Sequence, residues 1–144
     1  MQKPANSETG PDEPAGGDTG PVRALNEARS GGQLTVTVDR PGDGVAVLHV
    51  AGEVDLLTAG TLGERIRANL GSESRVLVLD LTEVSFLGSA GLAEIVSASQ
   101  SAAERGARIM LVATNRAVLR PMEVTGLLSV LPVFQTVDAA LASS

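Results

Sequence analysis

The stretch FLGSAGL, Phe86 to Leu92, is the first candidate for chemistry in this 144-residue chain, because it places the hydroxyl of Ser89 among small residues. A serine becomes a nucleophile when a neighbouring base activates it. The only histidine is His49, which lies in a predicted strand, and nothing in the sequence places it beside Ser89. The stretch also lacks the G-x-S-x-G spacing of a nucleophile elbow, since Gly88 directly precedes Ser89. Ser89 therefore does not predict a hydrolase.

The composition argues against other kinds of catalytic or ligand site. The chain has no cysteine, which excludes disulfides, thiolate nucleophiles and cysteine-based metal sites. One histidine, without carboxylates at ligand spacing, predicts no transition-metal site. The glycines match neither the phosphate-loop pattern nor the G-x-G-x-x-G fingerprint. We therefore expect no enzyme, no catalytic residue, no metal and no cofactor.

The charge balance argues against nucleic acid as a partner. The formal net charge is −6, and the eleven Lys and Arg residues are scattered without a run, whereas phosphate backbones require clustered cations. Two phenylalanines are the only aromatic residues, so stacking platforms for bases are lacking. No apolar run approaches the ~18 residues of a membrane span, and the N-terminus has no apolar segment of a secretory signal. We expect a cytoplasmic protein without a membrane partner.

The composition divides the chain into two parts. Residues 1–32 are rich in Gly, Pro, Ser, Asp and Glu, and such a segment buries too little apolar surface to offset its ordering entropy. We predict a disordered acidic tail there and one folded domain over residues 33–144. Hydrophobic patterning within the domain predicts strands over 33–38, 45–52, 75–81 and 107–114, a short strand within 131–137, and helices over 58–70, 89–106, 115–128 and 137–143.

This order of elements predicts an α/β fold with a mixed sheet. The first two strands are expected to form a hairpin through the turn RPGDG, and the continuous apolar run 75–81 is typical of a central strand covered on both faces. Thr58 is a candidate helix N-cap, and Pro121 predicts a kink or a late start in its helix. The glycines expected to end helices are Gly71, Gly106 and Gly126. The inner face of helix 89–106 is expected to consist of Leu92, Ile95, Val96, Ser99 and Ala103.

Two motifs remain without an assigned role, GEVD at Gly52–Asp55 and FLGSAGL. On the residues alone, GEVD is a polar turn between a strand and a helix. FLGSAGL has an equally plain interpretation as a helix entry, in which Ser89 caps the helix and the glycines allow close backbone packing. The composition of FLGSAGL does not decide between this structural role and a functional one.

Four stretches together resemble the STAS domain of bacterial anti-sigma factor antagonists: AGEVDLLTAGTL, VLVLDLTEVSFLGSAGLAEIV, ARIMLVATN and VLRPMEVTGLLSVLPVF. GEVD resembles the family's G-E-[LV]-D, and FLGSAGL resembles its F-[LIM]-D-S-[ST]-G-L. The resemblance runs from about Leu34 to Ala142. It implies a STAS-type mixed sheet of four to five strands, with about four helices packed mainly on one face.

The resemblance also implies a function by protein binding. Members of the family bind an anti-sigma factor, often a serine kinase with a GHKL-type ATPase fold, and so release a sigma factor. We expect such a kinase as the partner, and a monomer or weak dimer as the oligomeric state. The residues expected at the partner surface are Asp55, Gly88, Ser89, Ala90, Gly91 and Leu92.

In that family, phosphorylation of a hydroxyl at the start of the helix breaks the complex. The usual acceptor position is Ala90 here, and the family's Asp is Gly88. Three interpretations stay open: Ser89 is the acceptor, shifted by one residue; or the antagonist is not switched by phosphate; or the domain is a scaffold module in a transport or stress-signalling assembly. Ser89 is the favoured acceptor, ahead of the other hydroxyls near the motifs, which are Thr58, Thr82 and Ser85.

Overall fold

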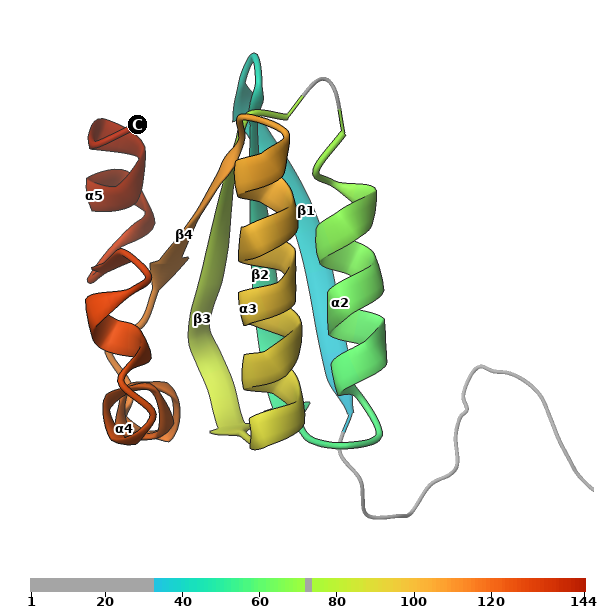
Figure 1. The fold of residues 1–144 in the computed structure, drawn as a ribbon, viewed down its shortest axis with the longest axis vertical. Helices are drawn as coiled ribbons and strands as arrows, with labels where there is room; N and C mark the ends of the chain where they lie inside the picture. Colours follow the sequence, from blue (N-terminus) through green and yellow to red (C-terminus); the bar gives the residue numbers. More distant parts are fainter. Residues whose placement is uncertain (1–32, 72–73) are drawn as a thin grey trace, which may run out of the picture. The chain divides into compact units, whose positions relative to one another are not determined.

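The structure is a computed structural model and describes residues 33–71 and 74–144. The tail predicted over residues 1–32 falls outside these ranges. The described chain forms an α/β fold around a five-stranded sheet of order β1-β2-β3-β4-β5, as predicted (Figure 1). The elements are β1 (Leu34–Gly42), β2 (Val45–Val54), α2 (Ala59–Ala68), β3 (Val76–Leu87), α3 (Ser89–Glu104), β4 (Arg108–Val112), α4 (Arg116–Val124), the 3-10 turn η2 (Leu127–Ser129), β5 (Val133–Phe134) and α5 (Val137–Ala142).

The sheet is mixed because its first pair is antiparallel and the others are parallel. β1 and β2 form the predicted hairpin, with Leu34 opposite Gly52. β2, β3, β4 and β5 then run in the same direction, and parallel neighbours require crossover connections, which α2, α3 and α4 supply. All carboxyl ends of β2, β3 and β4 therefore lie at one end of the sheet, which we call the carboxyl end. The opposite end is the amino end.

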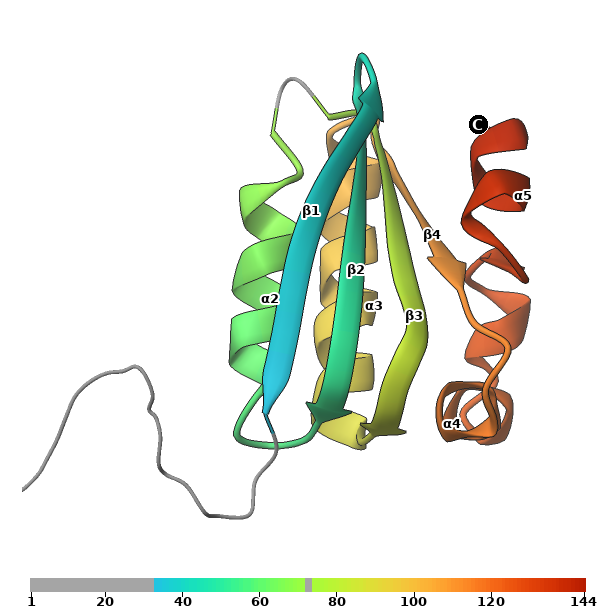
Figure 2. The same ribbon diagram turned by 180° about the vertical axis from the view of Figure 1, so that it is seen from behind.

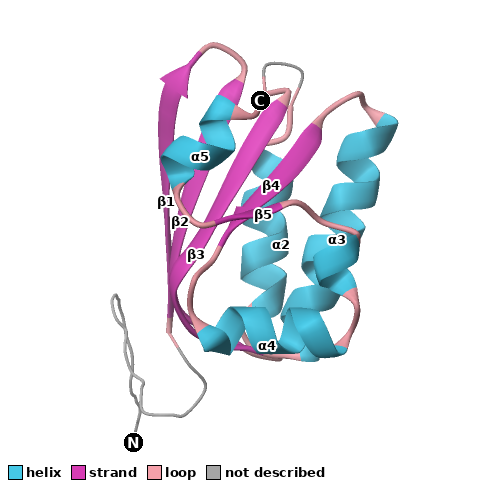
Figure 3. Cartoon of the chain, turned by 90° about the vertical axis from the view of Figure 1, so that its left-hand side faces the viewer, coloured by secondary structure: helices cyan, strands magenta, loops and turns pink. Residues whose placement is uncertain are grey.

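The two faces of the sheet are covered unequally. Helices α2, α3 and α4 pack on one face, where the main core lies, and α5 covers part of the other (Figures 1 and 2). Figure 3 shows α5 standing against the sheet on the side away from α2 and α3. The smaller cluster beneath α5 consists of Val47, Val78, Met110, Val112 and Ala140. The prediction that helices pack mainly on one face is thus confirmed, and β3 is covered on both faces as expected.

Two sequence-based assignments need correction. β3 continues to Leu87, well past the predicted end at residue 81, because two register shifts against β2 break the alternation that identifies a strand. The buried face of α3 was predicted out of phase, since Ala103 is exposed and Val96 and Ser99 are only partly buried. The residues that α3 buries are Gly91, Leu92, Ile95, Ala98 and Ala102. Small residues on the buried face allow α3 to lie close to the sheet, and the hydrophobic pattern alone does not predict that these small residues are buried.

The helix ends follow the sequence signals in part. Gly106 and Gly126 have φ angles of 76° and 80° just after α3 and α4, as predicted for helix-ending glycines. α2 ends at Ala68, before Gly71. α4 starts at Arg116 and contains Pro121, so it does not start late. None of the described helices combines the length and the apolar character needed to cross a bilayer.

Candidate interaction surface at the carboxyl end of the sheet

The GEVD motif forms the turn between β2 and α2. Gly52 has a φ of 113°, and a Cβ there would overlap the backbone oxygen of Gln33, so only glycine fits. The carboxylate Oδ1 of Asp55 accepts hydrogen bonds from the backbone N–H groups of Leu57 (2.9 Å) and Thr58 (3.1 Å). Asp55 therefore turns toward its own loop and fixes the conformation of that loop.

Thr58 stabilises the same turn through its side chain. Its Oγ1 donates to the backbone oxygen of Glu53 (2.7 Å) and accepts from the backbone N–H of Asp55 (3.0 Å). Thr58 occupies the predicted N-cap position of α2, but its side chain makes no capping hydrogen bond to the helix. The turn held in this way presents Leu56 and Leu57 to solvent, with exposed fractions of 84% and 75%.

The FLGSAGL motif lies directly beside this turn. Gly88 donates its backbone N–H to the oxygen of Val54, the residue before Asp55 (2.9 Å). A Cβ at Gly91 would overlap the side chains of Val54 and Leu87, so the first turn of α3 packs closely against the end of β2. The structure therefore brings the two motifs together.

Ser89 is the first residue of α3, and its side chain points into solvent. The predicted capping role of Ser89 is wrong, because the N-cap position is occupied by Gly88. The Ser89 hydroxyl has no hydrogen-bond partner among the described residues. The backbone N–H of Leu92 donates to Gly88 O (3.1 Å), so the N–H groups of residues 89–91 precede the first intrahelical bond and are available to an anion.

The other hydroxyls near the motifs are engaged. Thr58 is buried, with 9% of its surface exposed, and is hydrogen-bonded as described. The Oγ1 of Thr82 lies 2.8 Å from the Oδ1 of Asp80, and the Oγ of Ser85 lies 3.3 Å from the backbone oxygen of Gly52. Thr82 and Ser85 are exposed like Ser89, so the lack of a hydrogen-bond partner among the described residues is what distinguishes the Ser89 hydroxyl from all three.

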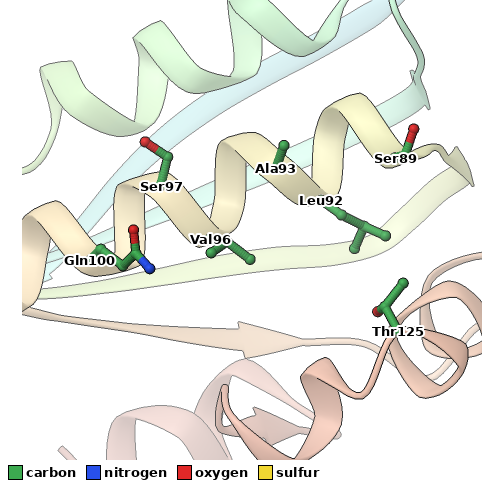
Figure 4. Close-up of a pocket in the computed structure, with 7 residues that line it drawn as sticks. All are labelled: Ser89, Leu92, Ala93, Val96, Ser97, Gln100 and Thr125. Atoms are coloured by element: carbon green, nitrogen blue, oxygen red, sulfur yellow. The ribbon is translucent and has the colours of Figure 1, made fainter.

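An open groove of about 440 Å³ extends from Ser89 along α3. In Figure 4 the side chains of Leu92 and Val96 line its α3 side, and Thr125 faces them from the residue after α4. None of the lining residues is charged; they are Ser89, Leu92, Ala93, Val96, Ser97, Gln100 and Thr125. Of the residues predicted for a partner surface, Ser89 and Leu92 thus line the groove, whereas Gly91 is buried in the packing of α3 and Ala90 packs partly against the core.

Six large apolar side chains remain exposed in the segments that meet at this end of the sheet (Figure 1). Leu56, Leu57 and Phe86 lie in the β2–α2 turn and near the end of β3, and the Phe86 ring approaches Gly88. Val124, Leu128 and Val130 lie in α4 and the turn that follows it, on either side of Thr125. We call these six residues the apolar rim. Val38 on β1 is the one other exposed large apolar residue in ranges 33–71 and 74–144, so the apolar rim is a candidate interaction surface.

His49 belongs to a different part of the molecule. Its Nδ1 lies 2.9 Å from the Oδ2 of Asp80, across the β2–β3 pair. Burial alone would raise the pKa of the Asp80 carboxyl, but hydrogen bonds from Thr82 and His49 outweigh it and leave that pKa below its usual value. Within the described part of the chain, no three His, Asp or Glu side chains gather closely enough to hold a metal ion.

Residues 38–140 match the family model of the STAS domain. The chain belongs to the STAS domain family. The anti-sigma-F factor antagonist RsfB of Mycobacterium tuberculosis is 38% identical over 108 residues, which cover 75% of this chain and 87% of RsfB. The anti-sigma-B factor antagonist of Listeria monocytogenes is 35% identical over 86 residues, or 60% of this chain and 75% of that protein.

A solved structure supports the same family. The crystal structure of an anti-sigma factor antagonist from Mycobacterium paratuberculosis matches this STAS domain with a TM-score of 0.71 at 35% identity, and covers 77% of this chain and 93% of that one. The family and the fold predicted from the two motifs are therefore confirmed. The relatives are named as antagonists of anti-sigma factors.

Proposed function

We propose that this STAS protein is an anti-sigma factor antagonist that binds a serine-kinase anti-sigma factor through the apolar rim and the groove beside Ser89. The observation that carries the proposal is that six of the seven exposed large apolar side chains of the described residues lie in segments at the carboxyl end of the sheet, from which an uncharged groove extends along α3. Burying a leucine that is almost fully exposed contributes about 1.5–3 kcal/mol, so Leu56 and Leu57 are suited to be the anchors of a complex. Binding to the anti-sigma factor would release its sigma factor.

The structure supports Ser89 as a phosphorylation site. The kinase would transfer the γ-phosphoryl group of ATP to the Ser89 Oγ, with release of ADP and of the hydroxyl proton. The new group carries about −1.5 to −2 charges, and the free N–H groups and dipole at the start of α3 stabilise it in the domain alone. A bound partner would instead have to cover that charge in a groove without any charged side chain. Phosphorylation should therefore break the complex and leave the fold intact.

The antagonist proposal is tested by capture from a lysate of the native organism, with the proteins identified by mass spectrometry. We expect an anti-sigma factor with a kinase domain to bind the wild type and to be lost with Leu57→Asp. The matched control is Val38→Asp, which alters the exposed apolar residue outside the rim. Recovery of a transport complex, without any sigma-factor regulator, would contradict the proposal.

The phosphorylation site is tested separately by intact mass after incubation with the captured kinase and ATP. Wild type should gain ~80 Da, the mass of one phosphoryl group, and Ser89→Ala should gain none. An unchanged mass gain in Ser89→Ala would exclude Ser89 as the sole acceptor. This result would leave the docking proposal standing, because docking depends on the apolar rim.

A second candidate function is a scaffold module that phosphate does not switch. It is favoured by Ala90, which stands at the family's usual acceptor position and packs partly against the core. Binding by such a module would be the same for wild type and Ser89→Glu. For either function we propose a cytoplasmic monomer or weak dimer that contacts neither nucleic acid nor membrane.

A further inference from the structure

We propose that strand β1, at the outer edge of the sheet, pairs with β1 of a second copy of this chain and forms a weak antiparallel dimer. β1 comes first in the strand order, and among the described residues it pairs with β2 alone (Figure 2). Its segment Leu34–Val38 reads LTVTV, so apolar and threonine side chains alternate identically in both chain directions. Two antiparallel copies of such a strand are complementary, as a two-fold symmetric interface requires. No residue of the apolar rim lies on β1, so this dimer does not depend on the antagonist function.

The register against β2 decides which backbone groups of β1 point outward. The backbone N–H of Glu53 on β2 donates to the oxygen of Gln33 (3.2 Å), so Gln33 faces β2. In an antiparallel pair, residues that exchange backbone hydrogen bonds alternate with residues that do not. The register stays regular through residues 34–39, so every second residue after Gln33 also faces β2. The residues whose backbone groups point away from the sheet, toward a further strand, are therefore Leu34, Val36 and Val38.

The side chains match when the two strands are centred on Val36. Val36 then lies opposite Val36 of the second copy, and Leu34 lies opposite Val38 of that copy. These side chains are on the helix-covered face, where Leu34 and Val36 already pack against the main core and Val38 is 37% exposed. On the other face Thr35 lies opposite Thr37, and both are exposed in the single chain. Apolar pairs and threonine pairs each stabilise antiparallel strands.

Charges do not oppose this pairing. Native edge strands are often protected from association by charged residues, proline or bulges. In β1 these features occur within residues 39–42, beyond the paired segment. Leu34–Val38 has no charged residue, so no like charges face each other. The Nη2 of Arg65 donates to the oxygen of Val36 (3.2 Å), but a carbonyl oxygen has two lone pairs and accepts a second hydrogen bond from the partner strand.

The small size of the paired segment makes the dimer weak. Five residues from each copy bury less than the ~1,200 Å² of a specific stable interface, so we expect a dissociation constant on the order of 0.1–1 mM. Sedimentation velocity of the full chain, at concentrations that span this range, should show exchange between monomer and dimer. A wild type that stays monomeric throughout would overturn the proposal.

Substitution of Val38 tests the location of the interface. Val38→Lys places an ammonium group opposite Leu34 of the second copy and should weaken dimerisation at least about tenfold. The matched control is Ala103→Lys, which adds the same charge at an exposed position of α3 and should dimerise as the wild type does. Equal dimerisation of the two variants would place the contact elsewhere and contradict pairing through β1.

Hydrogen exchange of the ¹⁵N-labelled chain tests the outward-facing backbone groups. The amide of Val36 should exchange more slowly as the protein concentration rises, whereas the amide of Thr37 faces β2 and should be protected at every concentration. Slow exchange of Val36 at all concentrations would mean that the edge is covered within one chain. Fast exchange at all concentrations would mean that it does not pair. Either result would refute the dimer.

The register is tested by disulfide formation, because the natural chain has no cysteine. Thr35→Cys is mixed with ¹⁵N-labelled Thr37→Cys and oxidised. The two thiols face each other at a non-hydrogen-bonded pair, where the Cα separation suits a disulfide. The mixed dimer, identified by its mass, should form at least about tenfold faster than either homodimer, in which each thiol faces a threonine. Equal rates for the three dimers would rule out the register centred on Val36.

Discussion

The two ends of the sheet differ in chemistry although the same connections build both. The carboxyl end has an uncharged groove, the apolar rim and the unpaired hydroxyl of Ser89. The amino end has a pocket with Arg75 and Arg105, beside Arg40. Helices α2 and α3 begin at the carboxyl end and finish at the amino end, whereas α4 lies across the carboxyl end (Figure 3). The starts of α2 and α3 therefore give the carboxyl end positive helix termini, and their last turns give the amino end negative ones. An added phosphoryl group is thus stabilised at the first, and arginines are stabilised at the second.

The junction between the two motifs is more tightly packed than the turn at Gly71. At the carboxyl end, Gly52 and Gly91 have no room for a Cβ. At the amino end, a Cβ on Gly71 would have no atom within 4 Å. Close packing is therefore specific to the junction of the two motifs, because a Cβ on Gly60 or Gly126 would also have no atom within 4 Å.

The largest expected effect is the loss of affinity for the anti-sigma factor in Leu57→Asp. A carboxylate in place of a side chain that is 75% exposed costs the domain little, but in a complex it would be buried against apolar groups. Affinity for the captured anti-sigma factor should fall at least ~100-fold, an anchor-sized effect of about 3 kcal/mol. Isothermal titration measures it, and Arg75→Gln serves as the control from the amino end. An equal loss in Arg75→Gln would remove the distinction between the two ends.

Gly91→Ala tests the tight packing at the carboxyl end. Its Cβ would overlap Val54 and Leu87, so we expect the free energy of unfolding to fall by about 2 kcal/mol, as for an overpacked core. Urea denaturation measures this change. Gly71→Ala is the matched control at the amino end and should stay within ~0.5 kcal/mol of the wild type. A Gly91→Ala variant as stable as Gly71→Ala would show that the residues around Gly91 can accommodate a methyl group at little cost in free energy.

Ser89→Glu tests the switch at the start of α3. Glutamate carries less charge than a phosphoryl group, so affinity for the anti-sigma factor should fall about tenfold, or ~1.4 kcal/mol. Ala103→Glu is the matched control, because Ala103 is exposed on the same helix at the amino end. Similar affinities for Ser89→Glu and the wild type would favour the scaffold function that phosphate does not switch.

The smallest expected effect is on the free energy of unfolding and concerns Asp80, which lies between the two ends of the sheet. Its pKa is lower in the folded state than its ordinary value of 3.8, so the unfolded chain takes up the proton first as the pH falls. The stabilising contribution is complete above the ordinary value and is lost as the pH drops through the folded-state pKa. Asp80→Asn should cost about 1 kcal/mol at neutral pH.

The pH dependence of urea unfolding checks this prediction. The difference between wild type and Asp80→Asn should shrink as the pH falls below ~4, the range in which carboxylates become protonated. Thr82→Val should show a change in the same direction, because Thr82 donates to Asp80. A difference that stays constant with pH would place the effect of Asp80→Asn in packing rather than in charge.

Local patterns were enough to predict most of the fold. The apolar runs and glycine stops predicted each described strand and helix, and the motifs GEVD and FLGSAGL predicted the family. Errors occurred where a contact distant in sequence decides the local structure. Gly91 packs on Val54, α3 buries Ala102 in place of Ala103, and β3 continues past residue 81 because it pairs with β2.

The candidate docking surface was predicted only in part. Sequence signals led to Asp55, Ser89 and the neighbours of Ser89, but the residues predicted for the partner surface did not include Leu56, Leu57 or Phe86. A hydrophobic residue within a short turn gives no sign of exposure, because burial depends on which elements pack over it. The two successive leucines after Asp55 were the one available signal, since a tight turn cannot bury both.

The sequence by itself determined the family, the order of the elements and the single hydroxyl at the start of α3, because these depend on residue types and short spacings. The tertiary structure alone decided which surfaces the chain presents. The scattered arginines argued against nucleic acid as a partner, and only the fold brings Arg75 and Arg105 to one pocket. The residues of the apolar rim likewise belong to segments that precede and follow α3 in the sequence. Such juxtapositions arise from strand pairing and crossover connections, which bring together residues that no local pattern relates.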